Sequence, residues 1–253
     1  MGYNKRKLHM KNVIFMINIV KDDRSRNQGY DYSIKSWQQY AKKYDCELFV
    51  LNELVADLEY MTPHWTKMYI LDILDVNEIE YDQVLYVDSD TIITPNAPNI
   101  FDISEHKFCA VPNFGDKDWM IRSMENYSYE LFDNFKFPYF NYFNSGVMVF
   151  NKSHKEFFKS IQQFYETNRS KITWMQKHYG VGHDQPVFNF FVNKELKDEY
   201  KVLGYEWNMQ DLNRSELLGN DFMFTRYGYV CHFNCGIKPT PGAWMQATYE
   251  YLY

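Results

Sequence analysis

The chain has 253 residues, a hydrophobic fraction of 45% and a formal net charge of −6 at pH 7. This length favours one large domain over two, and we expect a single domain over residues 1–253 with a flexible stretch at residues 1–10. The acidic balance disfavours a general nucleic-acid-binding protein, because such proteins need a basic face to displace counterions. Aromatic residues make up 19% of the chain, a share that suits both an aromatic-rich core and a groove that stacks on sugars or bases.

Neither the cysteines nor the start of the chain indicates secretion or membrane insertion. Cys231 and Cys235 lie four residues apart, but no second pair of ligands follows them, so a zinc site is disfavoured and free thiols in a reducing compartment are favoured. The apolar run at residues 13–20 is too short to span a bilayer and contains Asn18. We therefore expect a cytoplasmic protein without a membrane segment.

The first part of the chain alternates strands with helices. Predicted strands cover residues 11–20, 46–51 and 83–87, and predicted helices cover residues 30–44 and a stretch that opens at Thr62-Pro63. This alternation predicts an α/β fold with a mostly parallel central sheet flanked by helices. Ligands of such sheets bind beyond the carboxyl ends of the strands, where the polar loop at residues 21–29 would meet the residues that follow the third strand.

The second part has a less regular pattern. Residues 108–112 and 142–150 are predicted strands, and residues 153–168 are a predicted helix capped by Ser153. A further helix is expected over residues 184–192, with Asp184 at its N-cap, so that Asp184→Asn would leave the stability little changed. No repeat or linker divides the chain.

The third predicted strand ends at two carboxylates, in Val87-Asp88-Ser89-Asp90. Strand side chains alternate between faces, so Asp88 and Asp90 point the same way. Two neighbouring carboxylates repel each other unless a cation lies between them, and Mg²⁺ or Mn²⁺ with such oxygen ligands commonly shares them with a phosphate. A solvated turn is the alternative, because Asp-Ser-Asp is also common in turns.

Three later segments add to this pair. Asn144-Ser145-Gly146 enters a strand, and its glycine permits close approach of the backbone to a ligand, although a simple turn has the same signature. Asp184-Gln185 opens a helix, where helix capping is the alternative role for Asp184. His232 and Lys238 lie six residues apart and offer a metal ligand and a phosphate-binding cation.

In this order the segments resemble the GT-A glycosyltransferases of the glycogenin and bacterial lipopolysaccharide galactosyltransferase family, over roughly residues 11–238. Asp88-Ser89-Asp90 corresponds to the DxD motif, and residues 143–149 and 182–189 look very like glycogenin's versions. The spacing of His232 to Lys238-Pro239 matches the closing motif, but Gly236 comes one residue later than in the family. Thr240 stands where a Trp usually follows.

The resemblance implies a single GT-A, Rossmann-like domain and a role for each motif residue. Asp88, Asp90 and His232 would bind Mn²⁺ or Mg²⁺, with Asp88 also contacting the donor ribose. Asn144, Asp184 and Gln185 would hold the donor sugar and supply the catalytic groups. The remaining contacts to the nucleoside-diphosphate sugar would come from Asn18 and Asp22 at the base and from Lys67, Gly236 and Lys238 at the sugar and phosphates.

The implied activity is a metal-dependent, retaining transfer of a hexosyl or pentosyl group from a nucleoside-diphosphate donor, UDP-sugars first among them. A sugar nucleotidyltransferase is the nearest rival, but it would need a glycine-rich loop where residues 21–29 contain only Gly29. A catalytically silent sugar-nucleotide or glycan-binding module is the second alternative. The acceptor is a glycan, a protein or a small molecule, and a modified DNA base ranks last because of the acidic balance.

Overall fold

The computed structural model describes residues 10–19, 27–212, 221–234 and 241–253. Its centre is a six-stranded sheet in the order β2-β1-β3-β6-β5-β7. The strands are β1 (Asn12–Ile17), β2 (Glu47–Leu51), β3 (Gln83–Asp88), β5 (Phe108–Pro112), β6 (Phe143–Asn151) and β7 (Tyr200–Val202). All neighbouring strands pair in parallel except at β6, which runs antiparallel to both β3 and β5. The predicted mostly parallel sheet is confirmed.

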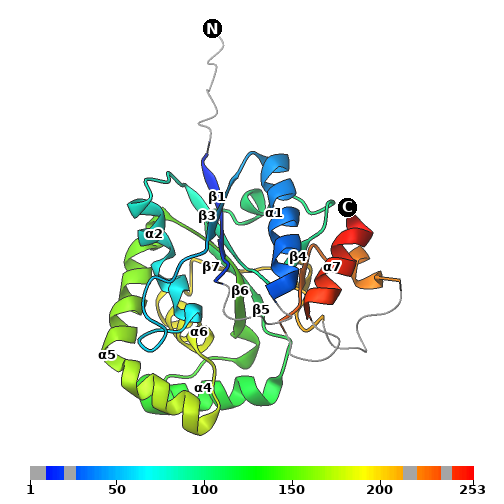
Figure 1. Cartoon of the computed structure of the whole chain (residues 1–253). Coiled ribbons are helices and arrows are strands. Elements are labelled where there is room, and N and C mark those ends of the chain that lie inside the picture. The colour runs from blue at the N-terminus through cyan, green and yellow to red at the C-terminus, as the bar shows by residue number, and fades with distance from the viewer. Residues whose placement is uncertain (1–9, 20–26, 213–220, 235–240) are drawn as a thin grey trace.

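Helices cover both faces of the sheet (Figure 1). On one side lie α2 (Ile70–Val76), α4 (Lys117–Leu131), α5 (Lys155–Tyr179) and α6 (Asp184–Glu195), and on the other lie α1 (Tyr30–Tyr44) and α3 (Ile100–Ile103). Side chains of β1 alternate between the two layers, since Phe15 packs in the first core cluster and Met16 in the second. The predicted α/β layering is thus confirmed.

A second, two-stranded sheet lies beside the main one. Its strands are β4 (Thr91–Ile93) and β8 (Val230–His232), which pair antiparallel with Thr91 opposite His232. Helix α7 (Pro241–Leu252) packs on this sheet through Met245. The pairing places Asp90, the residue before Thr91, next to His232, although the two residues are 142 positions apart in the chain.

Short 3₁₀ turns connect these elements. They are η1 (Asn27–Gly29), η2 (Pro63–Tyr69), η3 (Tyr139–Asn141), η4 (Lys152–His154), η5 (Tyr205–Trp207) and η6 (Met223–Arg226). The stretch predicted to open at Thr62-Pro63 does begin at Pro63, first as η2 and then as α2. Among the described residues, no helix combines the length and the apolar character that crossing a bilayer would need.

Several predicted boundaries are wrong. The strand expected over residues 11–20 ends at Ile17, and the helix expected over residues 184–192 runs on to Glu195. The helix expected over residues 153–168 is α5, which runs on to Tyr179 because no glycine or proline interrupts it before Gly180, and Gly180 ends it with φ of 61°. Its cap is also not Ser153. The Asn151 side chain accepts the Ser153 backbone N–H, and His154 Nδ1 accepts the Asn151 backbone N–H, so η4 opens with a capping box.

Candidate active site

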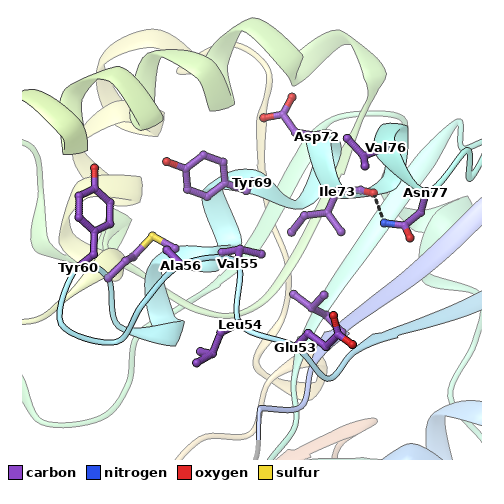
Figure 2. A pocket seen from close by; sticks show the side chains of 12 residues that line it. Glu53, Leu54, Val55, Ala56, Tyr60, Tyr69, Asp72, Ile73, Val76 and Asn77 are labelled. Carbon is purple, nitrogen blue, oxygen red and sulfur yellow. Dashed lines mark hydrogen bonds between the residues drawn. The ribbon is translucent and has the colours of Figure 1, made fainter.

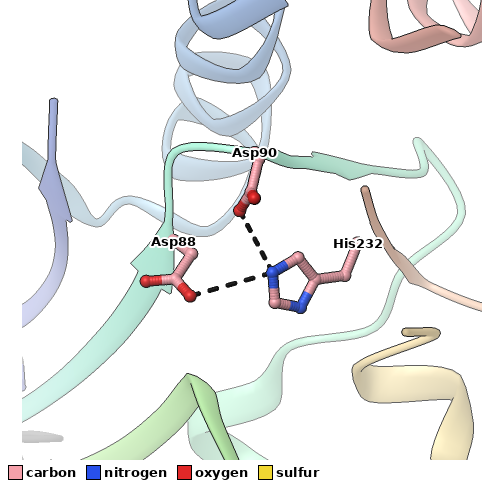
Figure 3. Close-up of side chains that lie close together, drawn as sticks. All are labelled: Asp88, Asp90 and His232. Carbon is pink, nitrogen blue, oxygen red and sulfur yellow. Dashed lines mark hydrogen bonds and ion pairs between the residues drawn. The ribbon is translucent and has the colours of Figure 1, made fainter. Parts of the chain in front are cut away.

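Asp88, Asp90 and His232 converge at the carboxyl end of β3 (Figure 3). His232 Nε2 lies 3.1 Å from Asp90 Oδ1 and 3.7 Å from Asp88 Oδ2. One ligand atom from each residue lies within 4.8 Å of the other two. The side chains of Asp90 and His232 are buried, whereas that of Asp88 is 28% exposed. The three residues predicted to bind metal are therefore brought together at one partly open position.

A hydrogen-bonded chain of amides fixes how His232 presents its ring. Asn144 Oδ1 accepts the Gly146 backbone N–H at 2.9 Å and also accepts Asn208 Nδ2 at 3.0 Å. Asn208 must then turn its Oδ1 toward His232 Nδ1, which lies 2.8 Å away and has to be the donor. In the neutral imidazole this leaves the lone pair on Nε2, directed at the two carboxylates.

This donor set fits a divalent cation. Two carboxylates and a neutral imidazole are the ligand types that Mn²⁺ and Mg²⁺ sites use, and the hydrogen bond on the opposite ring nitrogen is the usual support of a ligating histidine. Asp88, Asp90 and His232 are thus the residues that would hold the ion.

Gly146 gives the ring and the carboxylate the space they occupy. β6 pairs antiparallel with β3 with Val147 opposite Val87, so Gly146 lies one step further along, beside Asp88. A Cβ built on Gly146 would overlap His232 Cε1 and lie 2.7 Å from Asp88 Oδ2. The sequence predicted close approach of the backbone to a ligand at this glycine, and the groups that approach it in the structure are the side chains of His232 and Asp88.

Lys67 and Asp184 form a buried ion pair next to Asp88. Lys67 Nζ lies 3.0 Å from Asp184 Oδ2 and 3.4 Å from Asp88 Oδ1, and it donates to Ser145 Oγ at 3.1 Å. Burial acts to lower the pKa of Lys67, but the two carboxylates outweigh it and raise that pKa. Burial acts to raise the pKa of Asp184, but Lys67 and His64 hold it below its usual value. Both groups therefore stay charged.

Asp184 is not a helix cap, contrary to the prediction. His183 is the N-cap residue of α6, and Asp184 is its first helical residue. The Asp184 carboxylate instead accepts the Ser145 hydroxyl at 2.9 Å and pairs with Lys67. Its neighbour Gln185 accepts the Ser145 backbone N–H on Oε1 at 3.1 Å. Both side chains are thereby fixed against β6 rather than against their own helix.

The nucleotide side of the site is only partly described. Asn18 follows β1, whose last residue Ile17 pairs with Asp88, so it lies at the same edge of the sheet. Its side chain donates to Asn52 Oδ1 at 3.1 Å. Asp22, Gly236 and Lys238 lie outside the described residues. Asn208, which orients His232 from just after η5, was missed because no motif surrounds it.

A separate cavity of about 490 Å³ lies between the loop after β2 and helix α2 (Figure 2). Leu54 and Val55 from the loop and Ile73 and Val76 from the helix give it apolar walls. Its lining does not include Asp88, Asp90 or His232. This cavity is therefore not part of the candidate active site at the end of β3.

The model of the family "Glycosyl transferase family 8" matches residues 3–241. The chain belongs to glycosyl transferase family 8. The family places the site described above in a glycosyltransferase, as the resemblance had implied. The comparison with curated proteins found no match.

Solved glycosyltransferase structures share the fold. A glycosyltransferase involved in the glycosylation of the major capsid of PBCV-1 superposes with a TM-score of 0.62 at 13% identity, over 95% of this chain and 98% of its own. The apo-form glycosyltransferase GlyE of Streptococcus pneumoniae TIGR4 gives a TM-score of 0.53 at 15% identity, over 96% of this chain and 60% of its own. At these identities the likeness shows the fold alone, which is the GT-A fold.

Proposed function

We propose that this family 8 enzyme is a metal-dependent, retaining glycosyltransferase that uses a nucleoside-diphosphate sugar, with UDP-sugars as the first candidates. The observation that carries the proposal is the convergence of Asp88, Asp90 and His232, with His232 Nε2 facing the two carboxylates. A ligand set of this kind, beside a buried lysine, suits a metal–diphosphate group. A bound Mn²⁺ or Mg²⁺ would act as a Lewis acid that stabilises the charge of the leaving diphosphate.

The two oxygens of Asp88 face different neighbours. Oδ2 faces His232, whereas Oδ1 accepts the Tyr86 hydroxyl and lies 3.4 Å from Lys67 Nζ. The carboxylate is therefore held in one orientation before any donor arrives, which lowers the cost of organising the site. Its partly exposed edge leaves room for a ribose hydroxyl.

The Lys67–Asp184 pair would hold the donor sugar. Asp184 stays ionised because its pKa is lowered, so it can accept a sugar hydroxyl and stabilise positive charge that develops on the sugar ring. Gln185 accepts the Ser145 backbone N–H beside this pair, and Asn144, the residue before Ser145, accepts the Gly146 backbone N–H. From the resemblance, Lys238 and Gly236 would contact the diphosphate, and Asn18 and Asp22 the base.

A donor screen tests the proposal. We expect one or more UDP-sugars to be hydrolysed slowly to free UDP in the presence of Mn²⁺, and EDTA to abolish this turnover. Restoring Mn²⁺ should restore the rate, because the ion stabilises the leaving group. Turnover that persists in EDTA would contradict the metal dependence.

Once an acceptor is found, the anomeric proton of the product should show the α configuration by NMR, and a β product would contradict retention.

A further inference from the structure

The segment from the end of β5 to the first turn of α4, residues 113–119 and called the β5–α4 segment below, is attached to the metal side of the site. The Phe114 backbone N–H donates to Gln210 Oε1 at 3.1 Å, and Gln210 Nε2 donates back to the Pro112 carbonyl at 2.9 Å. Gln210 lies two residues after Asn208, the residue that orients His232. Gly115 packs so closely on Asp211 that a Cβ would lie 2.7 Å from Asp211 Oδ2. The start of this β5–α4 segment is therefore fixed relative to His232.

The other end of the β5–α4 segment is attached to the sugar side. The Trp119 ring packs on Gly182, where a Cβ would lie 2.7 Å from Trp119 Cζ2. Gly182 precedes Asp184 by two residues, and its carbonyl accepts the Tyr127 hydroxyl at 2.9 Å. The β5–α4 segment thus connects the residues that would hold the metal with those that would hold the sugar.

Phe114 is the exposed aromatic residue of this segment. Its ring is 58% exposed, although its backbone is fixed, and it meets the edge of Tyr205 at a centroid distance of 5.1 Å and an angle of 86°. Tyr205 is held in turn by its hydroxyl, which donates to the Gln210 carbonyl at 3.3 Å. A large apolar ring in a fixed position with an open face costs little entropy when a ligand covers it.

We propose that Phe114, supported by Tyr205, forms the acceptor subsite, and that the acceptor is a carbohydrate whose pyranose ring stacks on Phe114. This inference rests on the proposed function. The acceptor hydroxyl must reach the anomeric carbon, which lies between the diphosphate and the rest of the donor sugar. The β5–α4 segment spans the residues that would hold those two parts.

The chemistry around Phe114 selects a sugar over a nucleic acid. The C–H groups on one face of a pyranose match the negative face of an aromatic ring. Asp116 caps α4 with Oδ1, which accepts the Trp119 backbone N–H at 3.0 Å, and its second oxygen would accept a sugar hydroxyl. Asp116 and Asp118 flank Lys117, so the local charge is negative. A polyanionic duplex would need the opposite charge.

The test uses the full chain with Phe114→Ala and Phe114→Trp, and Tyr129→Ala as a matched control, because Tyr129 is a 72% exposed aromatic residue on α4. The probes are cellobiose, maltose, lactose and N,N′-diacetylchitobiose. Saturation-transfer NMR measures their binding in the presence of UDP and Mn²⁺, and UDP release without any disaccharide measures donor hydrolysis. The binding measurement does not need turnover, so a failure of the proposed function is seen separately as absent hydrolysis.

We expect at least one disaccharide to bind the parent chain, and Phe114→Ala to weaken that binding and any transfer to it about ten-fold. Phe114→Trp should retain both, and Tyr129→Ala should change neither. Donor hydrolysis by Tyr129→Ala should match that of the parent chain, and in Phe114→Ala disaccharide binding should fall more steeply than donor hydrolysis. The proposal is overturned if no disaccharide binds, if Phe114→Ala binds normally, or if its hydrolysis falls in parallel with binding.

Discussion

At the scale of single residues, the candidate metal site depends on a glycine that carries no functional group. The Gly146 backbone N–H begins the hydrogen-bonded chain that sets the tautomer of His232, and its missing side chain leaves space for the His232 ring and Asp88. The motif Asn144-Ser145-Gly146 predicted a close approach, but the partners could not be predicted. They come from segments that are far away in the sequence.

Gly146→Ala should weaken Mn²⁺ binding by about ten-fold or more, because the new methyl group displaces a ligating side chain. Isothermal titration with Mn²⁺ measures this. Gly180→Ala is the control, since a Cβ there meets nothing within 4 Å and the cost comes only from its φ of 61°. That control should lose about 1–2 kcal/mol of stability and bind Mn²⁺ normally. Equal Mn²⁺ affinities in both variants would contradict the steric role of Gly146.

A second prediction at this scale concerns the buried ion pair of Lys67 and Asp184. Because Asp184 pairs with Lys67 instead of capping α6, Asp184→Asn should now destabilise the protein, by about 3–5 kcal/mol, as should Lys67→Met. The double variant should cost less than the sum of the two by at least about 1 kcal/mol, since neither charge is left unpaired. Urea unfolding measures all three. Additive losses would show that the two groups act independently.

At the scale of elements, two short strands decide where His232 lies. β4 follows Asp90 directly, and its pairing with β8 brings His232 beside that carboxylate. Each strand has only three residues, which is too short for a clear hydrophobic pattern. The position of His232 was therefore predicted from the family resemblance, whereas the strand that ends at Asp88 was predicted from its apolar run.

His154, at the start of α5, should make the stability of the protein depend on pH. Burial lowers the pKa of His154, and its Nδ1 accepts the Asn151 backbone N–H, so the folded state requires the neutral ring. The folded-state pKa lies below the unfolded value of about 6.5. The contribution of His154 to stability is then complete above that value and is lost as the pH falls below it. Urea unfolding at several pH values between 7.5 and 5 should show stability falling toward the acid side.

His154→Gln isolates this contribution. A glutamine at the same position of the capping box can accept the Asn151 N–H and does not titrate. We expect the variant to lose less stability than the parent chain between pH 7.5 and 5. An identical pH dependence in both proteins would show that other groups cause the loss.

At the scale of the whole molecule, one reversed strand joins the two halves of the site. The alternating pattern of residues 11–87 predicted the parallel strands, and local sequence located β6 almost to the residue. The direction of β6 depends on long-range strand pairing and cannot be predicted from the local sequence. Because β6 runs antiparallel to β3, its first residues lie beside the end of β3, where Gly146 packs against Asp88 and Asn144 bonds Asn208.

The central claim is that Asp88, Asp90 and His232 bind one divalent ion that serves the diphosphate of the donor. Mn²⁺ binding measured by electron paramagnetic resonance, with UDP present, tests it most directly in the parent chain and in Asp90→Asn. We expect one bound Mn²⁺ per parent chain and an affinity at least about 10²-fold lower in Asp90→Asn, while the variant keeps its fold by circular dichroism. Equal Mn²⁺ binding by the two proteins would contradict the claim.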